Sequence, residues 1–267
     1  MERIYPIGIQ NFEKIRRDGY IYVDKTRFVY QLAKTGSYYF LSRPRRFGKS
    51  LLISTLQAYF EGKKDLFKGL AIEQLEKDWT VYPVLHLDLN ARNYEDENSL
   101  LEELNKHLEI WEQQYGSPYG DRAPEERFFH VIRLAHEKTG QRVVILVDEY
   151  DKPMLQAIEN DELQRVYRNQ LKPFYGVLKS MDGYIKLAFL TGVTKFGKVS
   201  VFSDLNNLTD LSMNPNYVEI CGMTEQEIHQ YFEPDIHTLA EKEKLSYEET
   251  CELLKTNYDG YHFTENS

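Results

Sequence analysis

The chain has few cysteines and no long apolar run, and both shortages limit the class of protein it can be. Its 267 residues include only Cys221 and Cys251, which lie far apart and share no metal-ligand spacing, so we expect buried, reduced thiols rather than a disulfide or a zinc site. No stretch approaches the roughly eighteen apolar residues of a membrane span, and residues 1–6 lack the apolar core of a secretory signal. The sequence therefore predicts a soluble cytoplasmic protein with no membrane partner.

Basic residues are also in deficit. The formal net charge of −9 argues against a broad nucleic-acid-binding face, because such binding depends mostly on neutralising phosphates. A local nucleic-acid contact stays open but has no support from this charge. With 42% hydrophobic and 28% charged residues and no internal repeat or long Gly/Ser linker, the chain suits one large α/β domain with a smaller appendage.

Residues 38–56 predict a strand, a loop and a helix. The apolar run 38–41 leads into S-R-P-R-R-F-G-K-S at residues 42–50, and an apolar-rich stretch follows. A phosphate chain needs this geometry, because N–H groups of the loop and helix start hold its anionic oxygens and a lysine neutralises its terminal phosphates. This Walker A pattern predicts a binder of a purine nucleoside triphosphate, ATP. The residues expected to bind it are Arg46, Phe47, Gly48, Lys49, Ser50 and Leu51, and the Ser50 hydroxyl is also expected to ligate Mg²⁺.

The loop departs from the usual motif at its first position, where Arg43 replaces glycine and must adopt a backbone angle that a Cβ tolerates. Pro44 has no N–H to donate to a phosphate, so the donors of residues 47–50 matter most. Arg43, Arg45 and Arg46 form a basic cluster that we expect beside the nucleotide or in a charged interface. The alternative is an ordinary solvated helix start with a chance Gly-Lys-Ser.

A second signal lies at residues 143–149, where five apolar, mostly β-branched residues precede Asp148 and Glu149. Such a run predicts a strand buried on both faces of a parallel sheet. Carboxylates at the carboxyl end of that strand lie at the edge where such folds bind ligands. In this Walker B position we expect Asp148 to hold Mg²⁺ through water and Glu149 to orient and deprotonate the attacking water. The alternative is a strand that merely ends in a polar turn, residues 148–153.

A third buried strand is predicted at residues 185–190 and ends at Thr191. In P-loop ATPases with the additional-strand arrangement, the strand between the phosphate-loop strand and the acidic strand ends in a polar residue that contacts the γ-phosphate or the water. Thr191 occupies that place and Thr194 is the fallback. Threonine also ends strands because of its β propensity alone, so the alternative that Thr191 has no functional role stays open.

Five separated blocks together resemble the bacterial predicted AAA-ATPase-like family. They are Y-V-D-K-T at 22–26, R-P-R-R-F-G-K-S at 43–50, D-E-Y-D-K-P at 148–153, L-T-G-V-T-K-F at 190–196 and Y-D-G-Y-H-F at 258–263. The resemblance implies a three-layer α/β/α P-loop NTPase fold with a mostly parallel sheet in the additional-strand, AAA-like arrangement. In that family the first loop position is commonly arginine, and many members carry a PD-(D/E)XK nuclease-like domain after the ATPase.

The remaining sequence predicts the organisation around this core. We expect a helix ending near Gly62, a strand at 84–89, helices around 97–114 and 124–138, a helix from about Asp161 that Pro173 kinks or ends, and a final strand at 217–220. Residues 1–222 would form the ATPase core with an N-terminal extension, whose pieces 12–15 and 20–23 either wall the adenine pocket or simply pack. Residues 223–267 would form a helical subdomain that starts with a capping box at Thr224.

We expect this helical subdomain to pack over the nucleotide, with Asp259, Tyr261 or His262 either near the site or only in packing and turns. Because the chain stops soon after residues 258–263, we expect an N-terminal fragment that lacks the nuclease-like part.

Three hypotheses for function remain, in this order. The first is a Mg²⁺-dependent ATPase, an ATP-hydrolysing switch that uses Lys49, Ser50, Asp148 and Glu149. The second is a nucleotide-gated interaction module with little turnover that regulates the missing nuclease-like domain. The third, a GTPase or small-molecule kinase, is disfavoured because no N-K-x-D motif is present. Arg46, Arg165 and Arg168 are open candidates for an arginine finger acting in an oligomer.

Overall fold

The core is a parallel sheet in a computed structural model that describes residues 4–116, 120–194, 205, 207–258 and 263. Its five strands follow the order β2-β3-β4-β1-β5, and every pairing is parallel. Their bounds are β1 Tyr38–Ser42, β2 Val84–Asp88, β3 Val143–Asp148, β4 Ile185–Gly192 and β5 Thr209–Asp210. The predicted α/β class with a parallel sheet is confirmed, and β4 lies between β1 and β3 as the additional-strand arrangement requires.

Both faces of this sheet are buried, which explains the unbroken apolar runs in the sequence. In β3, Val143, Ile145 and Val147 join one hydrophobic cluster, whereas Val144 and Leu146 join the other. In the neighbouring strand β4, Leu190 joins the first of these clusters and Phe189 joins the second. Successive side chains point to opposite faces of a strand, so a strand with helices on both sides can carry polar groups only at its ends.

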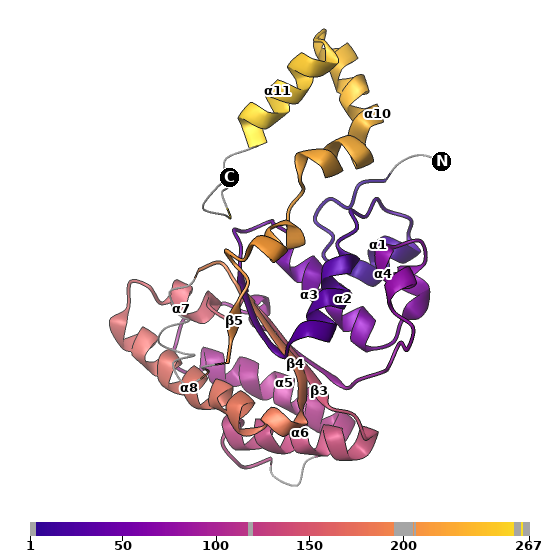
Figure 1. Cartoon of the computed structure of the whole chain (residues 1–267). Coiled ribbons are helices and arrows are strands. Elements are labelled where there is room, and N and C mark those ends of the chain that lie inside the picture. The colour runs from indigo at the N-terminus through magenta and orange to yellow at the C-terminus, as the bar shows by residue number, and fades with distance from the viewer. Residues whose placement is uncertain (1–3, 117–119, 195–204, 206, 259–262, 264–267) are drawn as a thin grey trace.

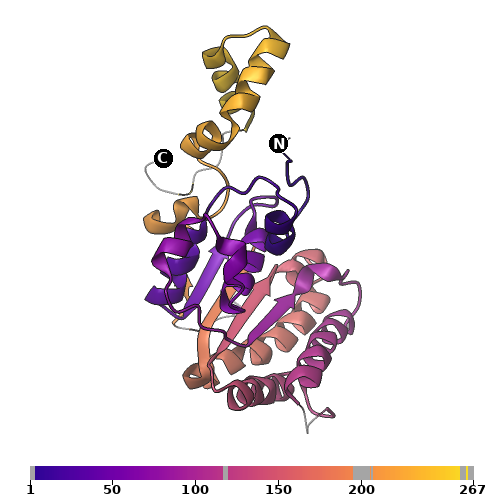
Figure 2. The ribbon, with the colours of Figure 1, turned by 90° about the vertical axis from the view of Figure 1, so that its right-hand side faces the viewer.

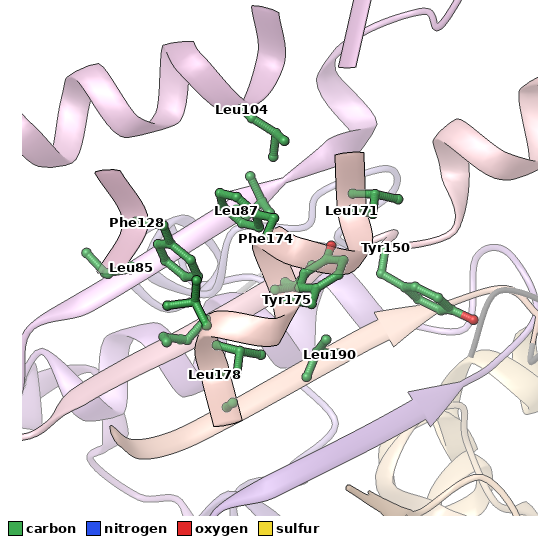
Figure 3. Close-up of a cluster of buried hydrophobic side chains, with 14 of the residues drawn as sticks. Leu85, Leu87, Leu104, Phe128, Tyr150, Leu171, Phe174, Tyr175, Leu178 and Leu190 are labelled. Carbon is green, nitrogen blue, oxygen red and sulfur yellow. The ribbon is translucent and has the colours of Figure 1, made fainter. Parts of the chain in front are cut away.

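The helices divide between the two faces, as the two views show (Figures 1 and 2). One face is covered by α1 (Phe12–Arg17), α2 (Thr26–Thr35), α3 (Lys49–Phe60) and α4 (Ala71–Leu75). The other face is covered by α5 (Ser99–Tyr115), α6 (Pro124–Thr139), α7 (Lys152–Gln156) and α8 (Asp161–Ser180). In this second layer the rings of Phe128 and Phe174 stack with centroids 4.4 Å apart (Figure 3).

Two boundary predictions need correction. Residues 217–220 are not a strand, because Pro215–Ile220 form the 3₁₀-helix η4, capped by the Asn214 side chain, and β5 occupies the sheet edge beside β1. Of the two outcomes expected at Pro173, a kink or an end, the structure rules out the end, since α8 continues past the proline and its apolar face buries side chains on both sides of it, including Leu171 and Leu178. That burial outweighs the hydrogen bond that proline cannot make.

The last two helices, α10 (Glu225–Glu243) and α11 (Tyr247–Tyr258), pack against each other away from the sheet (Figure 1). The predicted capping box is present between Thr224 and Glu227, and the Glu227 carboxylate also accepts hydrogen bonds from Lys25 Nζ at 2.6 Å. Both cysteines are free, and Cys221 is buried, whereas Cys251 is only partly covered. Within the described ranges, no helix is long and apolar enough to cross a membrane.

A buried carboxylate, Glu76, joins three helices on the α1–α4 face. It follows α4, accepts a hydrogen bond from the Tyr59 hydroxyl of α3, and pairs with Lys34 of α2 at 3.0 Å. Burial alone would raise the pKa of this carboxyl group, but hydrogen bonds from Tyr59 and the Asp78 N–H, together with Lys34, outweigh burial and lower it to about 2.

We predict that Glu76→Gln lowers the free energy of unfolding at pH 7 by about 1–3 kcal/mol, as expected for a lost hydrogen-bonded charge. The folded pKa lies below the ordinary value of 4.5, so this stabilisation is complete above about pH 4.5 and is lost as the pH falls toward 2. Thermal unfolding of both proteins from pH 7 to pH 3 should show the difference shrinking. A constant difference would contradict the role assigned to the charge.

Candidate functional site

The sequence-predicted polar residues gather at the carboxyl ends of β1, β3 and β4. The register places Leu41 of β1 beside Thr191 of β4, and Val147 of β3 beside Leu190. The loop after β1 therefore lies next to the end of β4, which in turn lies next to Asp148 and Glu149. This is the edge at which parallel α/β sheets bind ligands.

The loop between β1 and α3 turns through two left-handed residues. Arg46 has φ +67° and Gly48 has φ +89°. Gly48 caps α3, and its carbonyl accepts the Leu52 N–H at 2.9 Å. Glycine suits this position because a side chain there would be strained. Arg46 is exposed and Phe47 is partly covered, so the backbone of this loop stays near the surface.

Lys49 is the first residue of α3, and its ammonium group is buried among oxygens. Its Nζ donates to the carbonyls of Arg43 at 3.0 Å and Pro44 at 3.2 Å, and it lies 3.2 Å from Glu149 Oε1. The fold thus brings together the lysine of the loop and the glutamate of the acidic strand, which the sequence assigned to one site.

Glu149 lies just after β3 with its backbone in the left-handed region, φ +54°. Burial raises the pKa of its carboxyl group, Lys49 opposes this rise, and the charges of Asp148 and Asp151 add to it. The net direction is upward, so the carboxylate is a stronger base than one free in water.

Asp148 and Thr191 meet directly at the ends of β3 and β4. The Thr191 hydroxyl, which is 0% exposed, donates to Asp148 Oδ1 at 2.7 Å. The fallback residue Thr194 instead donates to Asp151 at 2.8 Å. Of the two threonines, Thr191 therefore contacts the acidic residue expected to serve the metal.

Ser50 and Leu51 occupy the first turn of α3. The Ser50 hydroxyl has no hydrogen bond to another described residue, whereas the neighbouring Lys49 side chain is fully engaged. Leu51 lines a mostly apolar cavity of about 370 Å³ that begins beside Gly48. Its walls include the N-terminal residues Ile21, Tyr22 and Val23, and the later residues Cys221, Gly222 and Phe232.

The predicted N-terminal pieces thus have different places. Residues 21–23 line the cavity, while Phe12 and Ile15 are completely buried in the hydrophobic core, which is the packing alternative. Burial raises the pKa of the Cys221 thiol to about 11, so this thiol is uncharged at neutral pH. Tyr261, His262 and Asp259 lie outside the described residues.

The expected cluster of three arginines does not exist, because Arg43 turns into the interior and is only 1% exposed. Its guanidinium donates to the carbonyls of Ser42 at 3.0 Å and Ser212 at 2.7 Å, with those of Tyr217 and Val218 at 3.5 Å. The guanidinium carbon also lies 4.1 Å from the Phe263 ring centre. Burial lowers the pKa of this arginine.

This role for Arg43 was missed from the sequence, since the partners that receive it are backbone carbonyls with no residue-type signature. Its backbone also needs no glycine, because the left-handed positions of the loop are Arg46 and Gly48. The Arg43 N–H donates to the Gly192 carbonyl at 3.1 Å and extends the contact between the loop and β4.

Known proteins resemble this chain over most of its length. A family model described as "Predicted AAA-ATPase" matches residues 6–202, which include the loop, the acidic strand and Thr191. A relative from Azotobacter chroococcum mcd 1, described as "Uncharacterized protein in vnfD 5'region", is 42% identical over 261 residues. That match covers 97% of this chain and 48% of the relative, so the chain spans about half the length of that curated protein.

Proposed function

This chain belongs to the predicted AAA-ATPase family, and from that premise we propose that it binds ATP with Mg²⁺ and hydrolyses it at the ends of β1, β3 and β4. The family supports nucleotide binding, and hydrolysis rests on the chemistry of the side chains. The observation that carries the proposal is the 3.2 Å contact between Lys49 Nζ and Glu149 Oε1. A phosphate-binding cation and a general base are both needed where the terminal phosphate is cleaved.

The phosphates would lie along the loop and the start of α3, against the N–H groups of residues 46–51. Lys49 would exchange the carbonyls of Arg43 and Pro44 for phosphate oxygens. This exchange suits an ammonium group that is already desolvated, because its attraction to an anion is stronger away from water.

A Mg²⁺ ion fits the oxygen atoms at this edge. The described residues contain no group of three or more acidic, His or Cys side chains arranged to hold a metal. Mg²⁺ does not need one, because it keeps several waters and takes one or two protein oxygens together with substrate phosphates. Ser50 would offer its hydroxyl, and Asp148 would offer the oxygen that Thr191 does not occupy. The ion would supply charge neutralisation at the phosphates.

For the chemical step we propose that Glu149 accepts a proton from the attacking water and Thr191 orients the reacting groups. The raised pKa of the buried Glu149 carboxyl group supports a role as base. Thr191 is fixed by its hydrogen bond to Asp148, so its position is tied to that of the metal-binding carboxylate.

The apolar cavity beside Gly48 is the proposed site of the adenine base. Its volume of about 370 Å³ lies at the lower end of the range of ligand pockets. It opens next to the phosphate loop, so a base held there would leave its phosphates within reach of α3. We further propose that residues 223–267 act as a helical subdomain, because Phe232 of α10 contributes to this cavity.

One observation favours a second candidate, a nucleotide-gated interaction module with little turnover. The same ion pair that joins Lys49 to Glu149 neutralises the proposed base, and the base is free only after the pair separates. Such a module would regulate a C-terminal nuclease-like domain in a longer cytoplasmic protein. The two candidates differ in turnover and not in ATP binding.

We predict that Lys49→Ala abolishes measurable binding of ATP·Mg²⁺, since the main cation facing the terminal phosphates is removed. Calorimetric titration of the wild type and the variant tests this. Lys64→Ala is the matched control, since this lysine is exposed and lies beyond the C-terminal end of α3, at the start of the 3₁₀-helix Lys64–Phe67. Unchanged affinity in Lys49→Ala would refute the phosphate-loop assignment.

A second prediction concerns the adenine base of the nucleotide. Val23→Trp should fill the cavity and weaken ATP binding by about tenfold or more, the effect of losing a little over 1.4 kcal/mol, while binding of inorganic tripolyphosphate stays unchanged. Ile158→Trp, at a surface position 59% exposed and outside the cavity walls, is the control. Equal losses of affinity for ATP and tripolyphosphate would show that the cavity does not hold the adenine base.

A third prediction separates the two candidate functions. Glu149→Gln should keep ATP binding but lower hydrolysis by roughly two to four orders of magnitude, the usual contribution of a general base. Asp148→Asn should also weaken Mg²⁺-dependent binding. Phosphate release and binding are measured on the same three proteins. Wild-type turnover indistinguishable from that of Glu149→Gln would leave the interaction module as the function.

A further inference from the structure

The turn that follows β3 is bonded to the turn that follows β4 through a buried carboxylate that the proposed chemistry does not use. Asp151 is only 1% exposed. Its Oδ2 accepts the N–H of Val193 at 3.0 Å, the N–H of Thr194 at 2.7 Å and the Thr194 hydroxyl at 2.8 Å. One carboxylate oxygen therefore holds three donors from the residues immediately beyond the end of β4.

Tyr150 adds two contacts between the same turns. Its N–H donates to the Thr191 carbonyl at 2.9 Å, and its hydroxyl donates to the Thr194 carbonyl at 2.9 Å. The ring lies at the margin of the buried cluster beyond Leu190, with the hydroxyl directed away from the cluster (Figure 3). The side chains of Tyr150 and Asp151 thus both make hydrogen bonds to the backbone of residues 193–194.

Gly192 makes this close approach feasible. A Cβ at that position would lie 2.5 Å from Tyr150 Cε1 and 2.6 Å from Asp151 Oδ1, closer than real contacts allow. Its φ lies outside the left-handed region, so the requirement for glycine comes from contact and not from backbone angle. The fit between the two turns therefore depends on the Asp151 carboxylate and on the missing side chain at 192.

We propose that Asp151 is a positioning residue for ATP hydrolysis, holding the end of β4 against the end of β3 so that Thr191 and Glu149 keep a fixed relation. Glu149 has a left-handed backbone, a strained conformation that persists only where the surroundings hold it. It stands between Asp148, which is bonded to the Thr191 hydroxyl, and Tyr150, which is bonded to the Thr191 carbonyl. Asp151 holds the next residues of the same segment, Val193 and Thr194, through its carboxylate.

This inference rests on the proposed hydrolysis and makes a specific kinetic claim about it. The phosphate loop meets the end of β4 at the hydrogen bond from Arg43 N–H to Gly192 O, whereas the groups proposed to bind ATP lie on α3 and in the loop itself. Loss of Asp151 should therefore displace Glu149 and Thr191 and lower the turnover number, while the affinity for ATP changes little. A displacement of about 1 Å at reacting groups costs on the order of a hundredfold in rate.

The test compares Asp151→Ala, Asp151→Asn and Gly192→Ala with Gly176→Ala as the matched control. Gly176 lies in α8, where an added Cβ meets nothing within 4 Å. For each protein the turnover number, the calorimetric dissociation constant for ATP·Mg²⁺ and the unfolding temperature are measured. The two glycine variants add the same atom, and only one of them adds it between the turns.

We expect Asp151→Ala and Gly192→Ala to lose about 10- to 100-fold in turnover number, with dissociation constants close to that of the wild type. Asp151→Asn should recover part of the loss, because an amide oxygen in the place of Oδ2 still offers two lone pairs to the donors of Val193 and Thr194. Gly176→Ala should match the wild type in turnover number and ATP affinity, and its unfolding temperature should be equal or higher, because alanine favours a helix interior over glycine. If Asp151→Ala fails to fold, Gly192→Ala and Asp151→Asn still decide the comparison.

Wild-type turnover in both Asp151→Ala and Gly192→Ala would overturn the positioning role while leaving the proposed hydrolysis intact. Parallel losses in turnover, ATP affinity and unfolding temperature would also overturn it, because they would mark Asp151 as a general stabiliser of the fold. A wild-type protein that binds ATP without hydrolysing it would remove both the proposed hydrolysis and this role, and the Glu149→Gln comparison identifies that case.

Discussion

Burial of the sheet on both faces is the constraint on which the rest of the molecule depends. Every interior residue of β3 packs into one of two hydrophobic clusters, so no polar side chain has room along the strand. Polar groups are forced to the strand ends, where Asp148, Glu149 and Thr191 converge because neighbouring parallel strands finish together. The carboxyl edge of the sheet thus lies where the two helical layers no longer cover the central strands, and polar side chains can gather there.

The Lys49 ammonium group links this edge to the phosphate loop. It is satisfied within the protein by two loop carbonyls and the Glu149 carboxylate. A buried cation with such partners holds the loop in shape, so the loop is organised by the residue that would bind the ligand. Any anion that draws Lys49 away from Glu149 also releases a carboxylate whose pKa burial already raises. Ligand binding and release of the Glu149 carboxylate would then be one event.

Much of the fold was predictable because apolar runs and strand-end residues report local environment. The strands β1 to β4, the helix after Gly-Lys-Ser and the capping box at Thr224 follow from periodicity and capping chemistry alone. The short β5 and the helix η4 were not predicted, since two residues of pairing leave no pattern and proline at a helix start resembles a break. Within the site, the meeting of Lys49 with Glu149 follows from strand order, whereas the partners of Asp151 and Arg43 are mostly backbone atoms, which sequence patterns do not encode.

Arg43 occupies the first position of the phosphate-loop motif, but its side chain has a structural role in the protein interior. Its guanidinium supplies donors to carbonyls at the end of β1, after β5 and in η4, and it faces the ring of Phe263. A change to glycine would make the chain look more like the standard loop and would remove the guanidinium from those carbonyls. Arg43 therefore ties the start of the phosphate loop to two later segments of the chain, and a shift of either segment would be transmitted to the loop through one side chain.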